Sequence, residues 1–377
     1  MLNHWLKPLS PATVADLEAW QFGKKIALHT VTPERDEAGS IKGGIPDLKE
    51  TQLAIIGINA DEADAVRTIL YGLSFPFHNL KVMDLGNLRK PDAAFGIPLL
   101  TELIQGGIVP IIIGQSETAI LPQFQAYHAK KNLVNLTIID EKIRFSPSPK
   151  PENQFFQNLL EDSHLFSMSV IGFQSHFTDP SVISLLEKRH FELVRLGRVR
   201  SDIEDMEPVI RDADLVAFNI AALKMSDAPA QNNPSPSGFS SEEACQLVRY
   251  AGMSDKLTSF GIYGFQRNLD NLDQTTAQVI AQMTWYFIDG FHNRKQDFPI
   301  QKAFNQLMQY IVDIKSFDER LVFWKSNKSG RWWMEIPIKT RKKHERHRLI
   351  PCSYNDYLQA CNDDLPERLV LAYQRFT

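Results

Sequence analysis

The sequence predicts a large α/β fold in which a mostly parallel sheet of about eight strands lies between two layers of helices. Short runs of β-branched and other apolar residues recur along the chain, and segments with helical spacing separate them. These runs are apolar throughout, which is typical of strands that are covered on both faces. The chain has 377 residues, of which 43% are hydrophobic, so it is long enough to bury such a sheet.

The predicted strands are short segments between turn residues. β-branched side chains favour extended backbone, and a length of four to eight residues separates such runs from helices. The eight predicted strands are residues 53–58, 81–84, 109–113, 134–140, 168–173, 191–196, 214–220 and 257–262.

Helical spacing of apolar residues fills the intervals between these strands. One helix start has a clear signal, because Ser240 and Glu243 have the spacing of a capping box, in which each side chain binds a free amide of the first turn. The predicted helices are residues 63–72, 93–105, 117–130, 153–161, 181–190, 240–252 and 274–290.

Residues 225–238 contain too many proline, serine and asparagine residues to form a regular element. A long ordered loop after a central strand is a common place for a site in α/β proteins, and disorder is the alternative.

The chain changes character after about residue 315. Residues 321–325 and 331–338 flank Asn327-Lys328-Ser329-Gly330 and predict an antiparallel hairpin. Two short helices are expected at residues 354–360 and 366–375. We therefore divide the chain into an α/β domain, residues 1–315, and a C-terminal extension, residues 316–377.

Composition excludes several classes of protein. The chain has 41 Lys and Arg residues against 45 Asp and Glu residues, which argues against a protein that binds nucleic acid over its whole surface. A local basic patch is still compatible with this balance. Three cysteines are too few for a disulfide framework or a zinc ribbon. Residues 1–10 lack a signal-peptide pattern, and the longest apolar stretch, residues 108–113, is too short to span a bilayer. We expect a cytoplasmic protein.

A series of short sequence landmarks runs in order between residues 53 and 290. They are residues 54–58 (AIIGI), 65–67 (AVR), 84–87 (DLGN), 111–117 (IIIGQSE), 136–144 (LTIIDEKIR), 216–221 (VAFNIA), 236–243 (PSGFSSEE) and 275–277 (TTA). Their order and spacing resemble the ureohydrolase superfamily, which includes arginase, agmatinase and especially formimidoylglutamase. The resemblance implies the three-layer αβα arginase-like fold, to which the C-terminal extension is an addition.

The resemblance also implies a dinuclear manganese centre, because amidine and guanidine carbons need a metal-bound hydroxide for attack at neutral pH. The family holds these ions with six carboxylate and imidazole ligands. The six matching positions here are Glu117, Asp140, Lys142, Arg144, Asn219 and Ala221. Only Glu117 and Asp140 can act as anionic ligands. Gly264 stands where the family places a glutamate that holds the substrate.

The charges at these positions argue further against metal. Glu117 and Asp140 are balanced by Lys142 and Arg144, so the cluster is neutral without an ion. Two divalent cations would add about four positive charges at a cost of several kcal/mol. We therefore expect no metal and no other cofactor, with Lys142 and Arg144 in place of the ions and Arg144 in a forked pairing with a carboxylate.

Three interpretations of this cluster stay open. In the first, the cluster is a salt-bridged plug. In the second, it is a pocket that binds a small zwitterionic or anionic molecule, or a protein loop. In the third, it is the active site of a hydrolase that uses Glu117 and Asp140 as acid and base. His176 follows the strand at residues 168–173 and is a further pocket candidate, although a lone histidine there is more often structural. The pocket candidates are thus Glu117, Asp140, Lys142, Arg144, His176, Asn219, Ala221 and Gly264.

The other histidines and the basic run at residues 339–348 give weaker signals. His78, His128, His164, His190 and His292 show no carboxylate or cysteine arrangement that forms a ligand set. The basic run follows Trp332 and Trp333 and could contact a phosphate backbone with the tryptophans as stacking platforms. The alternative is a solvated hairpin whose aromatic residues pack against the main domain.

Together these observations favour a non-catalytic, ureohydrolase-like pseudoenzyme that acts by binding a ligand or a partner. One alternative is a metal-dependent hydrolase of linear amidine or guanidine C–N bonds. Another is nucleic-acid binding through the basic run from Lys339 to Arg348. The resemblance also implies a homo-oligomer, and no membrane partner is expected.

Overall fold

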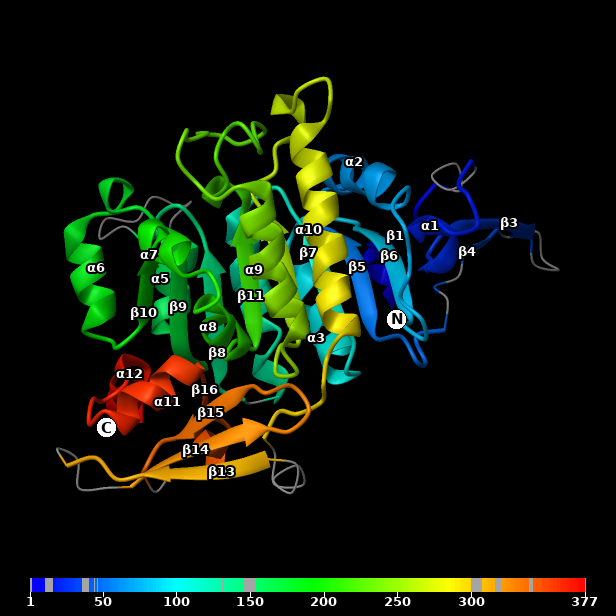
Figure 1. The fold of residues 1–377 in the computed structure, drawn as a ribbon. Coiled ribbons are helices and arrows are strands. Elements are labelled where there is room, and N and C mark those ends of the chain that lie inside the picture. The colour runs from blue at the N-terminus through cyan, green and yellow to red at the C-terminus, as the bar shows by residue number, and fades with distance from the viewer. Residues whose placement is uncertain are drawn as a thin grey trace.

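The computed structural model describes residues 2–10, 16–35, 41–43, 45, 47–130, 132–145, 154–299, 307–315, 320–338 and 342–376. Within these ranges the chain forms a ten-stranded, mostly parallel sheet with helices on both faces (Figure 1). The C-terminal extension, together with residues 307–312 that precede the predicted boundary at residue 315, builds a separate four-stranded antiparallel sheet. The predicted fold class is confirmed.

The main sheet has the strand order β1-β6-β5-β7-β12-β11-β8-β9-β10, and β2 pairs with β6 beside this path. From β6 to β10 in this order, each strand is parallel to its neighbours, and all eight predicted strands are among them. They are β5 (Leu53–Gly57), β6 (Val82–Leu88), β7 (Val109–Ile113), β8 (Val134–Ile139), β9 (Leu165–Phe173), β10 (Glu192–Arg195), β11 (Leu215–Asn219) and β12 (Ser259–Tyr263). The unpredicted edge strands β1 (Leu6–Lys7) and β2 (Ala27–Leu28) are too short to leave a pattern.

Alternate residues of each central strand face two separate hydrophobic cores. In β7, Ile111 and Ile113 belong to one core and Ile112 to the other. The first core is covered by α1 (Phe22–Lys25), α2 (Ala60–Leu70), α7 (Leu196–Ser201), α8 (Met206–Arg211), α9 (Ser241–Met253) and α10 (Thr275–His292). The second is covered by α3 (Ala93–Gln105), α4 (Ile120–Gln125), α5 (Gln154–Glu161) and α6 (Pro180–Glu187). None of the helices in the described ranges combines the length and the apolar character that crossing a bilayer requires.

The helix predicted over residues 117–130 is wrong as a single element. The structure has a 3-10 turn η3 (Glu117–Ala119), the short helix α4, and a second 3-10 turn η4 (His128–Lys130). Pro122 has no N–H to donate to the carbonyl of Thr118, so an α-helix cannot run through from Glu117. Residue 153, where the next helix was expected to begin, lies outside the described residues.

The loop over residues 225–238 is ordered. The amide of Met225 donates to the carbonyl of Ser235, and the side chain of Gln231 donates to the carbonyls of Leu223 and Ala228. The loop leads into α9, whose start has the predicted capping box between Ser240 and Glu243. It therefore holds a fixed shape above the carboxyl ends of the central strands (Figure 1).

The predicted C-terminal hairpin is present as β14 (Leu321–Ser326) and β15 (Trp332–Glu335). β13 (Leu307–Val312) and β16 (Leu349–Cys352) extend it on either side, and α11 (Tyr354–Cys361) and α12 (Glu367–Phe376) follow. A further small hairpin, β3 (Val31–Arg35) with β4 (Ile41–Gly43), lies near the N-terminus.

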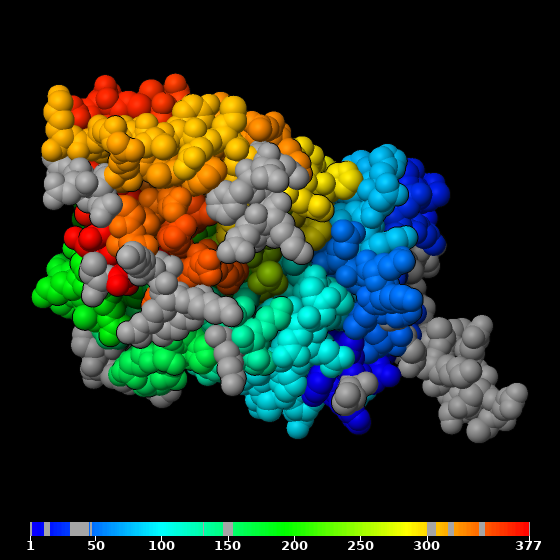
Figure 2. All heavy atoms as spheres, turned by 90° about the horizontal axis from the view of Figure 1, so that it is seen from below, coloured from blue at the N-terminus to red at the C-terminus, as the bar shows by residue number. Residues whose placement is uncertain are grey.

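This extension packs against the amino-terminal edge of the main sheet, opposite the long loop (Figure 1). Arg346 forms an ion pair with Asp214, which directly precedes β11 and is fully buried. Arg211 donates to the carbonyls of Trp332 and Cys352. In the view from below, the extension (orange and red) spreads over a large part of this end of the molecule (Figure 2).

One buried arginine fixes α2 against β6. Arg67 has no exposed surface, and all five of its N–H donors have partners. Nε and Nη2 donate to the two carboxylate oxygens of Asp84 at 2.8 and 3.0 Å. Nη1 donates to Asp64 and Asn87 at 2.8 and 2.6 Å, and Nη2 also donates to the carbonyl of Gly86 at 2.9 Å. The forked pair explains how a full charge is tolerated in the core.

We expect Arg67→Met to lower the free energy of unfolding by about 3–5 kcal/mol, because it leaves the buried Asp84 carboxylate without its cation. Urea titration measures the change. The matched control is Arg198→Met, which removes an exposed ion pair with Glu367 and should cost less than about 1 kcal/mol. Similar losses in the two variants would contradict the role given to Arg67.

Candidate functional site

Four neighbouring strands, β7, β12, β11 and β8, end at the same edge of the main sheet. Glu117 follows β7, Gly264 follows β12, Asn219 ends β11, and Asp140 follows β8. Because parallel strands bring their carboxyl ends to one edge, residues up to 147 positions apart in the chain lie together there. We refer to Glu117, Asp140, Arg144 and Asn219 as the carboxyl-edge cluster.

Arg144 lies between the two carboxylates of this cluster. Its Nε and Nη2 donate to the two oxygens of Asp140 at 2.6 and 3.1 Å, which is a forked pairing. Its Nη1 donates to Oε1 of Glu117 at 3.0 Å. A single guanidinium thus serves both of the carboxylates that remain from the six family positions.

These ion pairs lie largely out of contact with water. Asp140 is 1% exposed, and the side chain of Arg144 is 15% exposed. Burial alone would lower the pKa of Arg144, but the nearby carboxylates of Asp140 and Glu117 outweigh it and raise that pKa above its ordinary value. Arg144 is therefore a permanent cation at this edge of the sheet.

Asn219 completes the set of donors to Asp140. Its Nδ2 donates to Oδ2 of Asp140 at 3.0 Å, and its Oδ1 accepts from the amide of Ala221 at 3.0 Å. Ala221 itself is buried and contributes only its backbone. The side chain of Asn219 is thus held in a structural role, between a carboxylate and the start of the next turn.

Gly264 lies directly against Asn219. Its φ of +91° is in the left-handed region, and a Cβ added there would overlap Oδ1 of Asn219 and come within 3.3 Å of Ile220 Cγ1. A side chain at this position would therefore have to displace Asn219.

Two further candidates from the sequence do not join the cluster. Lys142 is partly buried and forms no ion pair with any residue that the structure describes. His176 lies in the 3-10 turn after β9, is exposed, and packs on Phe177 with 4.2 Å between ring centroids. Arg144 alone supplies the positive charge at the two carboxylates.

Glu141 is a buried acidic group that the sequence did not single out. It is 4% exposed, and its Oε2 finds no hydrogen-bond partner among the described residues. Burial, followed by the charge of Asp140, raises its pKa above the ordinary range. The sequence shows that Glu141 directly follows Asp140, but nothing in it indicates that the side chain of Glu141 is buried.

The residues present do not fit a dinuclear manganese centre. Both oxygens of Asp140 accept from Arg144, and Oδ2 accepts from Asn219 as well. Manganese prefers oxygen and imidazole ligands, and the remaining family positions hold a lysine, an arginine, an amide and a methyl group. A metal ion bound by Asp140 or Glu117 would lie close to the fixed positive charge of Arg144. The two positive charges would repel each other.

A cavity of about 540 Å³ lies between β5, β7, α3 and the segment that carries Glu117, and it is lined by the neighbours of Glu117 in the chain but by none of the four cluster residues. Ile56, Leu99 and Ile112 form part of its apolar wall, and Ser116 and Thr118 lie at its border. Among the described residues that line it, Asp92 has the only ionisable side chain, and that side chain caps α3.

The tryptophans of the C-terminal extension are packed inside the protein, so the alternative in which they serve as stacking platforms is not supported. Trp332 and Trp333 are 6% and 1% exposed, and the guanidinium of Arg211 lies over the ring of Trp333 at 4.6 Å. In the basic run, Arg346 pairs with a carboxylate, as does Arg348, whose Nη2 lies 2.6 Å from Glu335. Residues 339–341 and the side chains of 342 and 343 lie outside the described residues.

Comparison with solved structures identifies the fold. A formiminoglutamase of Trypanosoma cruzi with bound manganese matches with a TM-score of 0.60 and 18% identity, over 67% of this chain and 97% of that one. The formimidoylglutamase of Bacillus subtilis matches with a TM-score of 0.58 and 16% identity, over 70% and 98%. The agmatine ureohydrolase of Thermoplasma volcanium matches with a TM-score of 0.53 and 17% identity, over 66% and 92%.

These likenesses show that the chain has the arginase-like fold. No family model matches the sequence, and no curated protein matches it. These two formiminoglutamase structures cover 67% and 70% of this chain, so about a third of the chain has no counterpart in them.

We expect Gly264→Ala to destabilise the protein by about 1–3 kcal/mol, since it adds an overlap with Asn219 to the strain of a positive φ. Gly107→Ala is the matched control, because Gly107 has a φ of +77° with open space around it. Thermal or urea unfolding of both variants gives the comparison. If the two variants lose the same stability, the close packing of Gly264 on Asn219 is refuted.

Glu141→Gln should stabilise the protein at neutral pH. The folded-state pKa of Glu141 is raised, so the folded protein favours the protonated form, and wild type loses stability as pH rises through that pKa. The advantage of the Gln variant should vanish below the unfolded-state pKa of about 4.3 and grow as the pH rises to neutral. Urea titrations between acidic and neutral pH test this.

The control is Glu102→Gln, at an exposed position of α3, which removes the same charge from the surface. An advantage of Glu141→Gln that is constant over the pH range, or matched by Glu102→Gln, would show that Glu141 is not held in a desolvated position.

Proposed function

We propose that this chain is a member of the ureohydrolase superfamily that lacks the dinuclear manganese centre and acts by binding and not by hydrolysis. The observation that carries the proposal is the position of Arg144, whose guanidinium serves both Asp140 and Glu117. In this arrangement both carboxylates are bonded to a cation of the protein itself, which balances one of their two negative charges.

The neighbouring positions support the same conclusion. Asn219 donates to Asp140 where the family places an anionic ligand, and Ala221 offers only a methyl group. Gly264, which takes the place of the family's substrate-binding glutamate, packs against Asn219. A glutamate at position 264 would therefore displace Asn219, so the residues at these two positions depend on each other.

The cavity next to the segment that carries Glu117 suggests what is bound. Its wall is mostly apolar, and its one ionisable lining side chain in the described part of the chain is a carboxylate, Asp92. Such a wall favours a small ligand with an apolar body and hydroxyl or amide groups for the polar rim at Ser116 and Thr118. The sequence led us to expect a zwitterionic or anionic ligand, but the described residues of this lining include no cation for its negative group.

The test is an assay of hydrolysis with added Mn²⁺, with arginine, agmatine and formiminoglutamate as substrates and urea, formamide and ammonia as products. We expect no product above the level of a protein-free control, and no manganese retained in a stoichiometric amount. Asp140→Asn is the matched variant, because it removes the central carboxylate of the cluster.

Manganese-dependent turnover that disappears in Asp140→Asn would refute the proposal and favour the hydrolase alternative. Two tightly held manganese ions per chain, found by elemental analysis, would refute it as well.

A further inference from the structure

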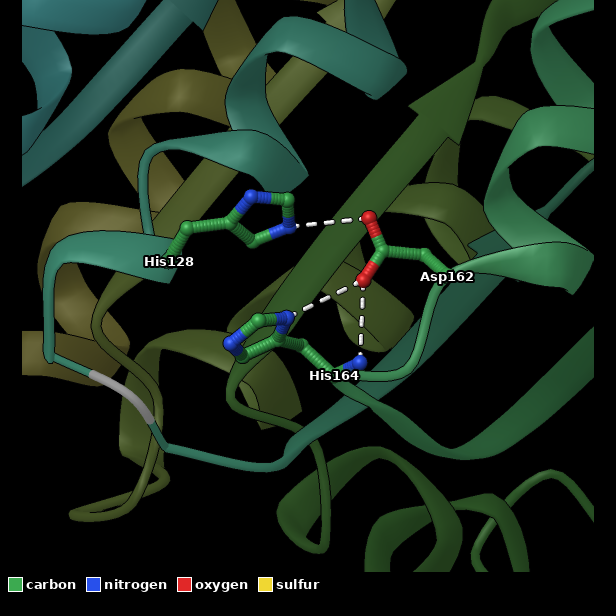
Figure 3. Close-up of side chains that lie close together, drawn as sticks. All are labelled: His128, Asp162 and His164. Atoms are coloured by element: carbon green, nitrogen blue, oxygen red, sulfur yellow. Dashed lines mark hydrogen bonds and ion pairs between the residues drawn. The ribbon is translucent and has the colours of Figure 1, made fainter.

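Two histidines and an aspartate form a cluster at the amino-terminal edge of the main sheet, opposite the carboxyl-edge cluster. His128 lies in η4, which precedes β8, and Asp162 and His164 lie in the turn between α5 and β9. Figure 3 shows that both imidazole rings are directed toward the carboxylate of Asp162. The expectation that these two histidines lack a carboxylate arrangement is therefore wrong.

The three side chains present one ligand atom each at short range. Nε2 of His128 lies 2.9 Å from Oδ2 of Asp162, and Nδ1 of His164 lies 3.2 Å from Oδ1. The ligand atoms all lie within 4.8 Å of one another. Ligands of tetrahedral zinc are about 3.3 Å apart for bonds of about 2.0–2.1 Å, so small side-chain rotations would close the site.

The environment of Nε2 of His128 is a second observation that points to a bound ion. This atom is buried, yet it has no hydrogen-bond partner among the described groups, because its contact with Asp162 has the distance of an ion pair without the alignment of a hydrogen bond. A buried imidazole nitrogen without a bond is costly unless something else binds it.

The backbone on both sides holds the ligands in place before any ion binds. The amide of His164 donates to Oδ1 of Asp162 at 2.9 Å, and the amide of Leu165 donates to the carbonyl of Asp162 at 3.1 Å. The carbonyl of His164 accepts from Val134, the first residue of β8, at 2.8 Å. The ring of His128 packs edge-on against the buried Phe124 at 6.0 Å.

The two imidazole rings also lie against each other and are partly open to solvent. The imidazoles of His128 and His164 are stacked with 4.3 Å between centroids and 23° between planes. This stacking limits the positions that the two rings can take. Their side chains are 36% and 28% exposed, which leaves a path for an ion.

We propose that His128, Asp162 and His164 bind one divalent transition metal ion of the Zn²⁺ class, with water in the remaining position. Two imidazoles with one carboxylate suit zinc better than calcium or magnesium, which prefer ligand sets made of oxygen atoms alone. The ion would join the connection between α4 and β8 to the connection between α5 and β9, so it would act as a clip at this edge.

The experiment is a titration of the full-length, chelator-treated protein with Zn²⁺ by calorimetry and with Co²⁺ by visible absorption. We expect one ion per chain and a rise in the thermal midpoint with Zn²⁺. His128→Ala and His164→Ala should each bind at least about tenfold more weakly, since even residues that only orient a ligand contribute about 10–100-fold.

Asp162→Asn gives a ligand-deficient variant that keeps a side-chain oxygen for the amide of His164, so it tests binding if an alanine variant fails to fold. His176→Ala and Cys361→Ser, which change an exposed histidine and an exposed thiol, should bind as wild type does. The proposal is overturned if wild type binds no ion with one-to-one stoichiometry, or if the His128, His164 and Asp162 variants bind as tightly as wild type.

Discussion

Asp140 follows a central strand inside the protein, where its negative charge needs a partner, and the whole carboxyl-edge cluster is arranged around that need. Arg144 supplies the charge and Asn219 a further donor, so both oxygens of the carboxylate are hydrogen-bonded within the protein. Arg67 and Asp84 solve the same problem on β6, on the other side of the sheet's centre. In both places a guanidinium from outside the strand neutralises a buried carboxylate.

The two sites differ in what they allow. Arg67 is fully enclosed and all its donors are used within the protein, so it is a structural element. Arg144 keeps some exposure, and its partner Glu117 is 25% exposed. Solvent therefore reaches part of the carboxyl-edge cluster, whereas it does not reach Arg67.

The sequence predicted the parallel strands well, because runs such as Ile111–Ile113 are apolar on both faces. It predicted the order of the strand ends too, and hence which residues meet at the carboxyl edge. It could not show that Arg144 turns inward and Lys142 does not, since this depends on side-chain packing. Nor could it show the cluster of His128 with Asp162 and His164, because 33 residues separate the first two and only the pairing of β8 with β9 brings them together.

The ion pair of Arg346 with Asp214 has a consequence for how the protein is made. Asp214 lies at the start of β11, in the middle of the main sheet, and is fully buried. The cation that neutralises it comes from a part of the chain that leaves the ribosome more than a hundred residues later. The charge balance of the sheet is therefore complete only after Arg346 has been made, and chains cut short before residue 346 should persist as partly folded species that chaperones and proteases recognise.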